Sequence, residues 1–341
     1  MEALMTDWPR IESVPERFVL PPERRPGKIN AFLSKNIPVI DLQKASGHDR
    51  AEIIQQILKA GQDFGLFQVV NHGVPEGLME ETMRMLKGFF SLPAEEKAKF
   101  MTKDGGKSCI LFSSSVNNAE TTKGFCFWRD CIIQQCHPLE DHLQFWPEKP
   151  LGYREVVGTY TVEMGKFLGK ILDLIGEGLE IEPGYFKGDL TQSHLLSVNH
   201  HVTCPDPTVT LGHAEHCDPQ LITTLHQCGV PGLQAFTDGQ WIAVDPLPGA
   251  VVVILGLPLQ VISNGKFRSP MHRVVTHAEN PRTTLSTLFV PKEDLLLEPA
   301  RALLNPSNPQ RYKTCTSKEI HSAWGLQLEE EVILERFKIH A

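Results

Sequence analysis

Two histidines and an aspartate have the types and the spacing that a metal site requires. His216 and Asp218 are separated by a single residue, Cys217, and His272 follows much later in the chain. Two imidazoles and one carboxylate can hold one face of a ferrous ion, and the opposite face stays open for substrates and dioxygen. We expect the His-x-Asp pair at the end of one strand, and His272 on a distant strand that folds back beside it.

A second pair with useful chemistry follows His272. Arg282 and Thr284 stand two residues apart, so on a strand both side chains project from the same face. A guanidinium fork with an extra hydroxyl donor suits a carboxylate at the back of a pocket. The sequence therefore predicts a carboxylate clamp close to the metal site.

A metal triad followed by a carboxylate clamp resembles the plant-type 2-oxoglutarate and Fe(II)-dependent dioxygenases. The resemblance covers most of the chain and includes the motifs at residues 37–42, 63–74, 89–93, 128–130 and 204–207. Within this family the chain is most similar to the hyoscyamine 6-hydroxylase branch. The features shared with that branch are the motifs at residues 204–207, 221–223 and 255–257.

This resemblance implies a cofactor, a co-substrate and the residues that bind them. Fe(II) would be held by the catalytic triad of His216, Asp218 and His272. The co-substrate 2-oxoglutarate would chelate the iron and contact Arg282, Thr284, Asn199 and His201. Dioxygen would be consumed, ascorbate would serve as reductant, and succinate and carbon dioxide would be released.

The chain departs from the family pattern at two places in this site. The family reads Arg-x-Ser where this chain has Arg282 and Thr284, so the hydroxyl is kept and a methyl is added. The family reads Asn-Tyr-Tyr-Pro where this chain has Asn199, His200, His201 and a valine. An imidazole can donate one hydrogen bond, reaches less far than a phenol and titrates near neutrality. His201 therefore either still contacts 2-oxoglutarate or belongs to a repurposed site.

The pattern of apolar residues predicts an α+β fold. The first half mixes strands at 39–41 and 66–70 with helices at 50–61 and 79–90, and residues 101–123 are expected to form a loop. A long supporting helix is predicted over 153–179. Short apolar runs then follow one another with turn residues between them, which indicates an antiparallel double sheet. The family carries a double-stranded β-helix, or jelly-roll, core of this kind.

We therefore expect one compact unit with two regions. Residues 1–150 would form the mixed α/β N-terminal dioxygenase region, with 1–36 wrapping the surface. Residues 151–341 would form the jelly-roll domain, with the supporting helix and a C-terminal helix.

Composition limits the classes of partner. A net charge of −8 and an isoelectric point near 6.0 argue against nucleic-acid binding, which needs a basic face. The N-terminus has no apolar signal core, and no apolar run is long enough to span a membrane. Eight cysteines without a Cys-x-x-Cys pair are typical of unpaired thiols in a reducing compartment. We expect a cytoplasmic monomer.

The substrate is expected to be a small plant specialised metabolite, such as an alkaloid, a phenolic or a terpenoid. Phe127 and Phe289 are candidate substrate contacts, and Glu120 is an acid without an assigned position. Hydroxylation is the favoured reaction, whereas epoxidation, demethylation and desaturation share the same iron site. Two alternatives stay open: a same-fold enzyme that acts without 2-oxoglutarate, and a catalytically silent binding protein.

Overall fold

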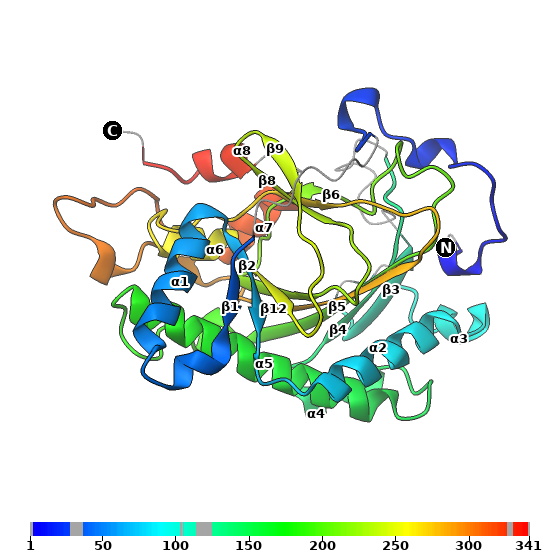
Figure 1. Ribbon diagram of the computed structural model, residues 1–341, viewed down its shortest axis with the longest axis horizontal. Coiled ribbons are helices and arrows are strands. Elements are labelled where there is room, and N and C mark those ends of the chain that lie inside the picture. The colour runs from blue at the N-terminus through cyan, green and yellow to red at the C-terminus, as the bar shows by residue number, and fades with distance from the viewer. Residues whose placement is uncertain are drawn as a thin grey trace.

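Two β-sheets face each other at the centre of the computed structural model (Figure 1). It describes residues 3–27, 37–102, 104, 106–113, 125–325 and 330–339. The larger sheet has the strand order β1 (Val39–Asp41), β2 (Leu66–Val70), β10 (Val251–Leu255), β7 (Ile222–His226), β12 (Arg282–Val290), β5 (Ser193–His201), β4 (Asp130–Gln135) and β3 (Cys109–Ser113). The smaller sheet has the order β6 (His213–His216), β11 (His272–Val274), β8 (Leu233–Thr237) and β9 (Gln240–Ala243).

The helices and short elements surround these sheets. The α-helices are α1 (Arg50–Asp63), α2 (Glu76–Phe90), α3 (Ala94–Ala98), α4 (Leu139–His142), α5 (Tyr153–Gly178), α6 (Leu257–Ile262), α7 (Ser317–Gly325) and α8 (Glu330–Glu335). The 3₁₀ helices are Met5–Asp7, Glu16–Phe18, Pro22–Arg24, Leu42–Ser46, Leu143–Phe145, Gly188–Leu190 and Arg301–Leu303. A small ribbon pairs β13 (Leu296–Leu297) with β14 (Cys315–Thr316).

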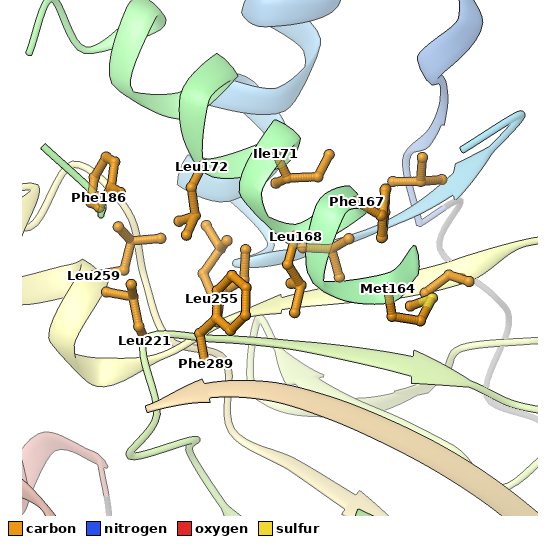
Figure 2. Close-up of a cluster of buried hydrophobic side chains, with 14 of the residues drawn as sticks. Met164, Phe167, Leu168, Ile171, Leu172, Phe186, Leu221, Leu255, Leu259 and Phe289 are labelled. Atoms are coloured by element: carbon orange, nitrogen blue, oxygen red, sulfur yellow. The ribbon is translucent and has the colours of Figure 1, made fainter. Parts of the chain in front are cut away.

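Helix α5 covers the outer face of the larger sheet and packs beside α1 and α2 (Figure 1). Its apolar residues recur at helical spacing and form one buried face. Figure 2 shows Leu168 and Leu172 on this face, directed toward Leu255 and Phe289 of the sheet. The long supporting helix expected from the sequence is therefore present and buries one side of the sheet.

Strand β12 separates this core from the opposite side of the sheet. Successive side chains of a strand alternate between its two faces. Leu285 and Phe289 pack in the core beneath α5, whereas Arg282, Thr284 and Leu288 line a cavity on the other side. One strand thus contributes both to the core and to the cavity.

The structure corrects the expected loop at residues 101–123. Within that interval Cys109–Ser113 forms β3, which pairs antiparallel with β4. Its side chains alternate between buried and half-buried, but the run is short and has glycine and serine on either side, which obscured the strand pattern. Residues 114–124, including Glu120, lie outside the described residues.

The N-terminal segment also differs from the expected surface wrap. Phe18 is buried and meets the ring of Trp128 edge to face, with centroids 5.2 Å apart. The carboxylate of Asp130 accepts hydrogen bonds from the backbone N–H groups of Met5 and Thr6. These contacts bury the segment because it supplies both apolar side chains and backbone donors.

Residues 1–150 and 151–341 share the larger sheet. The first region contributes β1 to β4, and the second contributes the four strands between β2 and β4 in the sheet order. In the described part of the chain, no helix has the length and apolar character needed to cross a membrane.

Candidate active site

The structure brings His216, Asp218 and His272 together. The Nε2 atom of His216 lies 3.5 Å from Oδ1 of Asp218, and Nε2 of His272 lies 3.6 Å from the same oxygen. One ligand atom from each residue falls within 4.8 Å of the others. His216 ends β6 and His272 begins β11, and the two residues are direct partners in the antiparallel pairing of these strands. The sheet register therefore places the distant histidine beside the His-x-Asp pair.

Backbone carbonyls orient both imidazoles of this triad. Nδ1 of His216 donates to the carbonyl oxygen of Ala214 at 2.9 Å, and Nδ1 of His272 donates to that of Pro270 at 3.0 Å. With the Nδ1 atoms protonated, the Nε2 lone pairs face Asp218. Oδ2 of Asp218 is buried and has no hydrogen-bond partner in the described structure. Two imidazole nitrogens and an unsatisfied carboxylate fit a divalent cation such as Fe(II).

The protonation states of Asp218 and His272 suit metal binding. Burial opposes ionisation of Asp218, but the neighbouring His272 and His216 lower the pKa of its carboxyl to about 2. Burial, assisted by His216, lowers the pKa of His272 to about 4. At neutral pH the carboxylate is therefore ionised and the imidazole is neutral, as metal ligands must be.

A cavity of about 320 Å³ extends from the triad across the inner face of the larger sheet. Six strands of the larger sheet form one wall of the cavity, and each strand that contributes several residues does so at alternate positions. These residues are Phe112, Cys131, Ile133, Leu195, Ser197, Asn199, His201, Thr223, Leu225, Ile254, Arg282, Thr284, Ser286 and Leu288. Trp324 of α7 lines another part of the cavity, with its ring 6.2 Å from that of His216. Sequence reasoning missed Trp324, because a lone aromatic residue in a C-terminal helix carries no signal for a site.

Arg282 presents a free donor to this cavity. Its side chain is almost completely buried, with Nε donating to the carbonyl oxygen of Val230 and Nη2 donating to Oε1 of Gln227, both at 3.1 Å. Among the residues that the structure describes, Nη1 has no partner. Burial lowers the pKa of Arg282 to about 10, so the guanidinium stays charged at neutral pH. A buried cation with one unsatisfied edge fits a carboxylate.

Thr284 and Asn199 lie beside this donor. Thr284 faces Asn199 in the pairing of β12 with β5, one alternation along from Arg282 and His201. All four side chains line the cavity. The structure thus brings the four predicted co-substrate residues together on one side of the triad.

The hydrogen bonding and the pKa of His201 differ from what the sequence predicted. Its Nδ1 donates to the carbonyl oxygen of Trp128 at 2.8 Å, so the neutral ring presents Nε2 as an acceptor. This Nε2 is buried and has no partner in the described ranges. Burial and the charge of Arg282 hold the pKa of His201 well below 6.5, which corrects the expectation that it titrates near neutrality. His200 projects from the other face of β5, where it stacks on Phe90.

Of the two candidate substrate residues, only one lines the cavity. Phe127 lines the cavity, as the sequence suggested. Phe289 is not among the lining residues, and its ring packs in the core beneath α5 and against His194 (Figure 2). The alternation of β12 turns Phe289 away from the cavity, so Phe289 does not contact a substrate there, contrary to the expectation from the sequence.

Comparisons with known proteins show which family this chain belongs to. Residues 192–291 match the model of the 2OG-Fe(II) oxygenase superfamily, and residues 37–149 match that of the non-haem dioxygenase in morphine synthesis N-terminal region. Hyoscyamine 6-dioxygenase of Hyoscyamus niger is 43% identical over 94% of this chain and 93% of its own length. This chain belongs to the 2OG-Fe(II) oxygenase superfamily. The resemblance drawn from the motifs is thereby confirmed, and with it the expected Fe(II) and 2-oxoglutarate chemistry.

Other relatives of this oxygenase have varied names. The 2'-deoxymugineic-acid 2'-dioxygenase of Hordeum vulgare is 38% identical, covering 92% of this chain and 91% of that protein. Flavanone 3-dioxygenase 2 of Oryza sativa subsp. japonica is 36% identical, covering 96% and 95%. The crystal structure of JOX2 in complex with 2OG, Fe and JA aligns with a TM-score of 0.84 at 28% identity, over 98% of this chain and 96% of that one. These matches confirm the α+β fold with a jelly-roll core.

Proposed function

We propose that this oxygenase couples the oxidative decarboxylation of 2-oxoglutarate to hydroxylation of a small plant specialised metabolite. One atom of dioxygen would enter the substrate as a hydroxyl group and the other would enter succinate, while carbon dioxide leaves. The observation that carries this proposal is the free Nη1 of Arg282 in the same cavity as the triad. A metal site alone would suit many reactions, whereas a metal site with a buried carboxylate clamp suits a keto acid co-substrate.

Each residue has a defined part in this proposal. His216, Asp218 and His272 would hold Fe(II), which supplies the oxidising chemistry when bound. Arg282 would bind the far carboxylate of 2-oxoglutarate, with Thr284 as an additional hydroxyl donor. The buried wall of the cavity would exclude water from the reacting centre.

The substrate class is the finer part of the proposal. The name of hyoscyamine 6-dioxygenase favours an alkaloid, and that of flavanone 3-dioxygenase 2 favours a phenolic. The charge of Arg129, which also lines the cavity, favours an acid instead. The division at residue 150, the monomeric state and the cytoplasmic location remain proposals that rest on the sequence.

A labelled-carbon assay tests the reaction. Purified protein receives Fe(II), ascorbate, dioxygen and 2-oxoglutarate labelled at its first carboxylate, together with fractions of a plant metabolite extract. We expect labelled carbon dioxide and an equal amount of succinate with the fractions that contain substrate, and neither product with His272→Ala.

The two alternatives give different results in the same assay. Substrate oxidation without succinate would support an enzyme that acts without 2-oxoglutarate, which the acceptor Nε2 of His201 in place of a phenol donor would favour. Absence of bound iron in the wild-type protein would support a silent binding protein. Either result would contradict the proposed function.

A further inference from the structure

A second arginine lines the cavity, and the proposed reaction leaves it without a role. Arg129 directly precedes β4. In the pairing of β4 with β5, Asp130 faces His200, so one step further along the same register Arg129 faces His201. His201 in turn faces Arg282 on β12. Arg129, His201 and Arg282 therefore form one row across the ends of three neighbouring strands, with a neutral imidazole between two cations.

In the part of the chain that the structure describes, the contacts of Arg129 leave its charge unpaired. Nη1 donates to Oδ1 of Asn199 at 2.8 Å, which is a neutral acceptor. Nε is buried and has no hydrogen-bond partner, and no carboxylate in the described ranges forms an ion pair with this side chain. Asp130 is next in sequence, but its carboxylate accepts from the backbone of Met5 and Thr6 instead. Burial lowers the pKa of Arg129, yet a guanidinium remains protonated in proteins.

The other charges of the site balance one another. The charges of Fe(II) and Arg282 together offset those of Asp218 and the two carboxylates of 2-oxoglutarate. Glu215 also lines the cavity, but Arg24 lies 3.2 Å from its carboxylate and Arg273 lies 3.4 Å from it. Among the described residues of the site, the positive charge of Arg129 is therefore left over when metal and co-substrate are bound. A buried unpaired charge is destabilising, which favours an anionic partner from outside the chain.

The surroundings of Arg129 fit the apolar body of a small ligand. Phe112, Phe127 and Ile133 line the same cavity, and so does Trp324, whose ring lies near that of His216. Burial, and next the charge of Arg129, hold the pKa of His213 well below its usual value, and His213 stacks on His216 with ring centroids 4.1 Å apart. Arg129 therefore lines the same cavity as an iron-binding histidine, together with these apolar side chains.

We propose that Arg129 binds the carboxylate of the substrate, so that this oxygenase acts on a small organic acid with an aromatic or aliphatic body. The inference rests on the proposed function and deepens it by naming the substrate class. The carboxylate would take the free Nε of Arg129, and the apolar walls would direct the rest of the molecule toward the triad. An amine-bearing substrate would instead meet a cation at this point.

The test compares acids with their own amides. Cinnamate, phenylacetate and indole-3-acetate are each paired with the corresponding primary amide, and binding to the anaerobic protein with Fe(II) and 2-oxoglutarate is measured by calorimetry. We expect at least one acid to bind roughly tenfold or more tightly than its amide, because the carboxylate gains charge-assisted hydrogen bonds. Arg129→Gln should remove that preference, and Arg129→Lys should keep part of it.

Two controls separate this role from others. Arg84→Gln makes the same substitution on the surface of α2 and should leave every affinity unchanged. The amide of Gln can still donate to Oδ1 of Asn199, so Arg129→Gln should keep the wild-type affinity for 2-oxoglutarate. It should not lower the midpoint of urea unfolding, since it removes an unpaired buried charge. If Arg129 were needed only for the fold, Arg129→Gln would lower that midpoint.

Several outcomes would overturn the proposal. These are equal binding of all acids and amides by the wild type, an acid preference that survives in Arg129→Gln, and a loss of 2-oxoglutarate affinity in Arg129→Gln with the acid preference intact. Fe(II) and 2-oxoglutarate are titrated into the wild type before the acids. If it binds neither of them, the proposed function itself fails, and the acid proposal fails with it.

Discussion

Gly256 controls the position of the loop that carries Asp218. The backbone N–H of Leu257 donates to the carbonyl oxygen of Asp218 at 2.8 Å, and that of Gly256 donates to Leu221 at 3.1 Å. A β-carbon on Gly256 would overlap the carbonyl oxygen of Gln220, and it would lie 2.8 Å from the Gln220 carbonyl carbon. Carbon atoms pack at about 3.5–4.0 Å from one another, and the overlap with the carbonyl oxygen is more severe, so Gly256→Ala must move this backbone by more than about 1 Å.

A shift of this size should weaken metal binding, because the moved backbone carries Asp218. A misplacement of about 1 Å can reduce catalysis by about 100-fold, and overpacking costs about 1–3 kcal/mol of folding free energy. We expect Gly256→Ala to bind Fe(II) at least about tenfold more weakly than the wild type and to unfold at a lower urea concentration. Anaerobic Fe(II) titration and urea unfolding of the same preparations measure both quantities.

Gly169→Ala is the matched control. Gly169 lies within α5, and a β-carbon there would meet no atom within 4 Å. Alanine is favoured over glycine in a helix by about 1 kcal/mol, so this variant should be slightly stabilised and should bind Fe(II) as the wild type does. Wild-type Fe(II) affinity in Gly256→Ala would refute the reasoning, because it would mean that the Asp218 loop does not depend on this close approach.

Three further predictions concern the clamp, the buried histidines and His201. Arg282→Lys keeps a charge but loses the planar fork, so the affinity for 2-oxoglutarate should fall by about 10- to 100-fold while Fe(II) binding is retained; equal calorimetric affinities would place the clamp elsewhere. Burial lowers the pKa of four histidines to about 4: His194, His200, His226 and His272. As pH falls below 6.5, these imidazoles are therefore protonated in the unfolded chain before they are protonated in the folded protein. The free energy of unfolding of the metal-free protein should decrease steeply between pH 6.5 and about 4. A flat urea midpoint across that interval would contradict the burial of these rings. Because His201 is already neutral, the affinities of the wild type and of His201→Tyr for 2-oxoglutarate should have parallel profiles between about pH 6 and 8. A wild-type affinity that falls with rising pH, against a constant affinity in the variant, would instead show that His201 takes up a proton on binding.

The sequence predicted those features that depend on local pattern. The spacing of His216, Asp218 and His272, the clamp at Arg282 and the apolar face of α5 were all visible, because ligand type and residue periodicity are local properties. Asp238 and Gly239 both adopt positive φ in the turn between β8 and β9, and an Asp-Gly pair is a local pattern that favours such a hairpin.

The features that the sequence did not predict depend on contacts between distant residues. The carbonyl oxygen that fixes the tautomer of His201 belongs to Trp128, 73 residues earlier in the chain. The unpaired state of Arg129 is visible only once the register of β4 and β5 is known. Phe289 was assigned to the cavity because the sequence gives the alternation of a strand but not which face looks inward.

The central claim is that His216, Asp218 and His272 together bind one Fe(II), and an anaerobic Fe(II) titration of the wild type and of Asp218→Ala tests it most directly. Removal of the only anionic ligand of the triad should abolish binding, whereas the wild type should bind a single ion per chain. Stoichiometric Fe(II) binding by Asp218→Ala with wild-type affinity would contradict the assignment of the metal site.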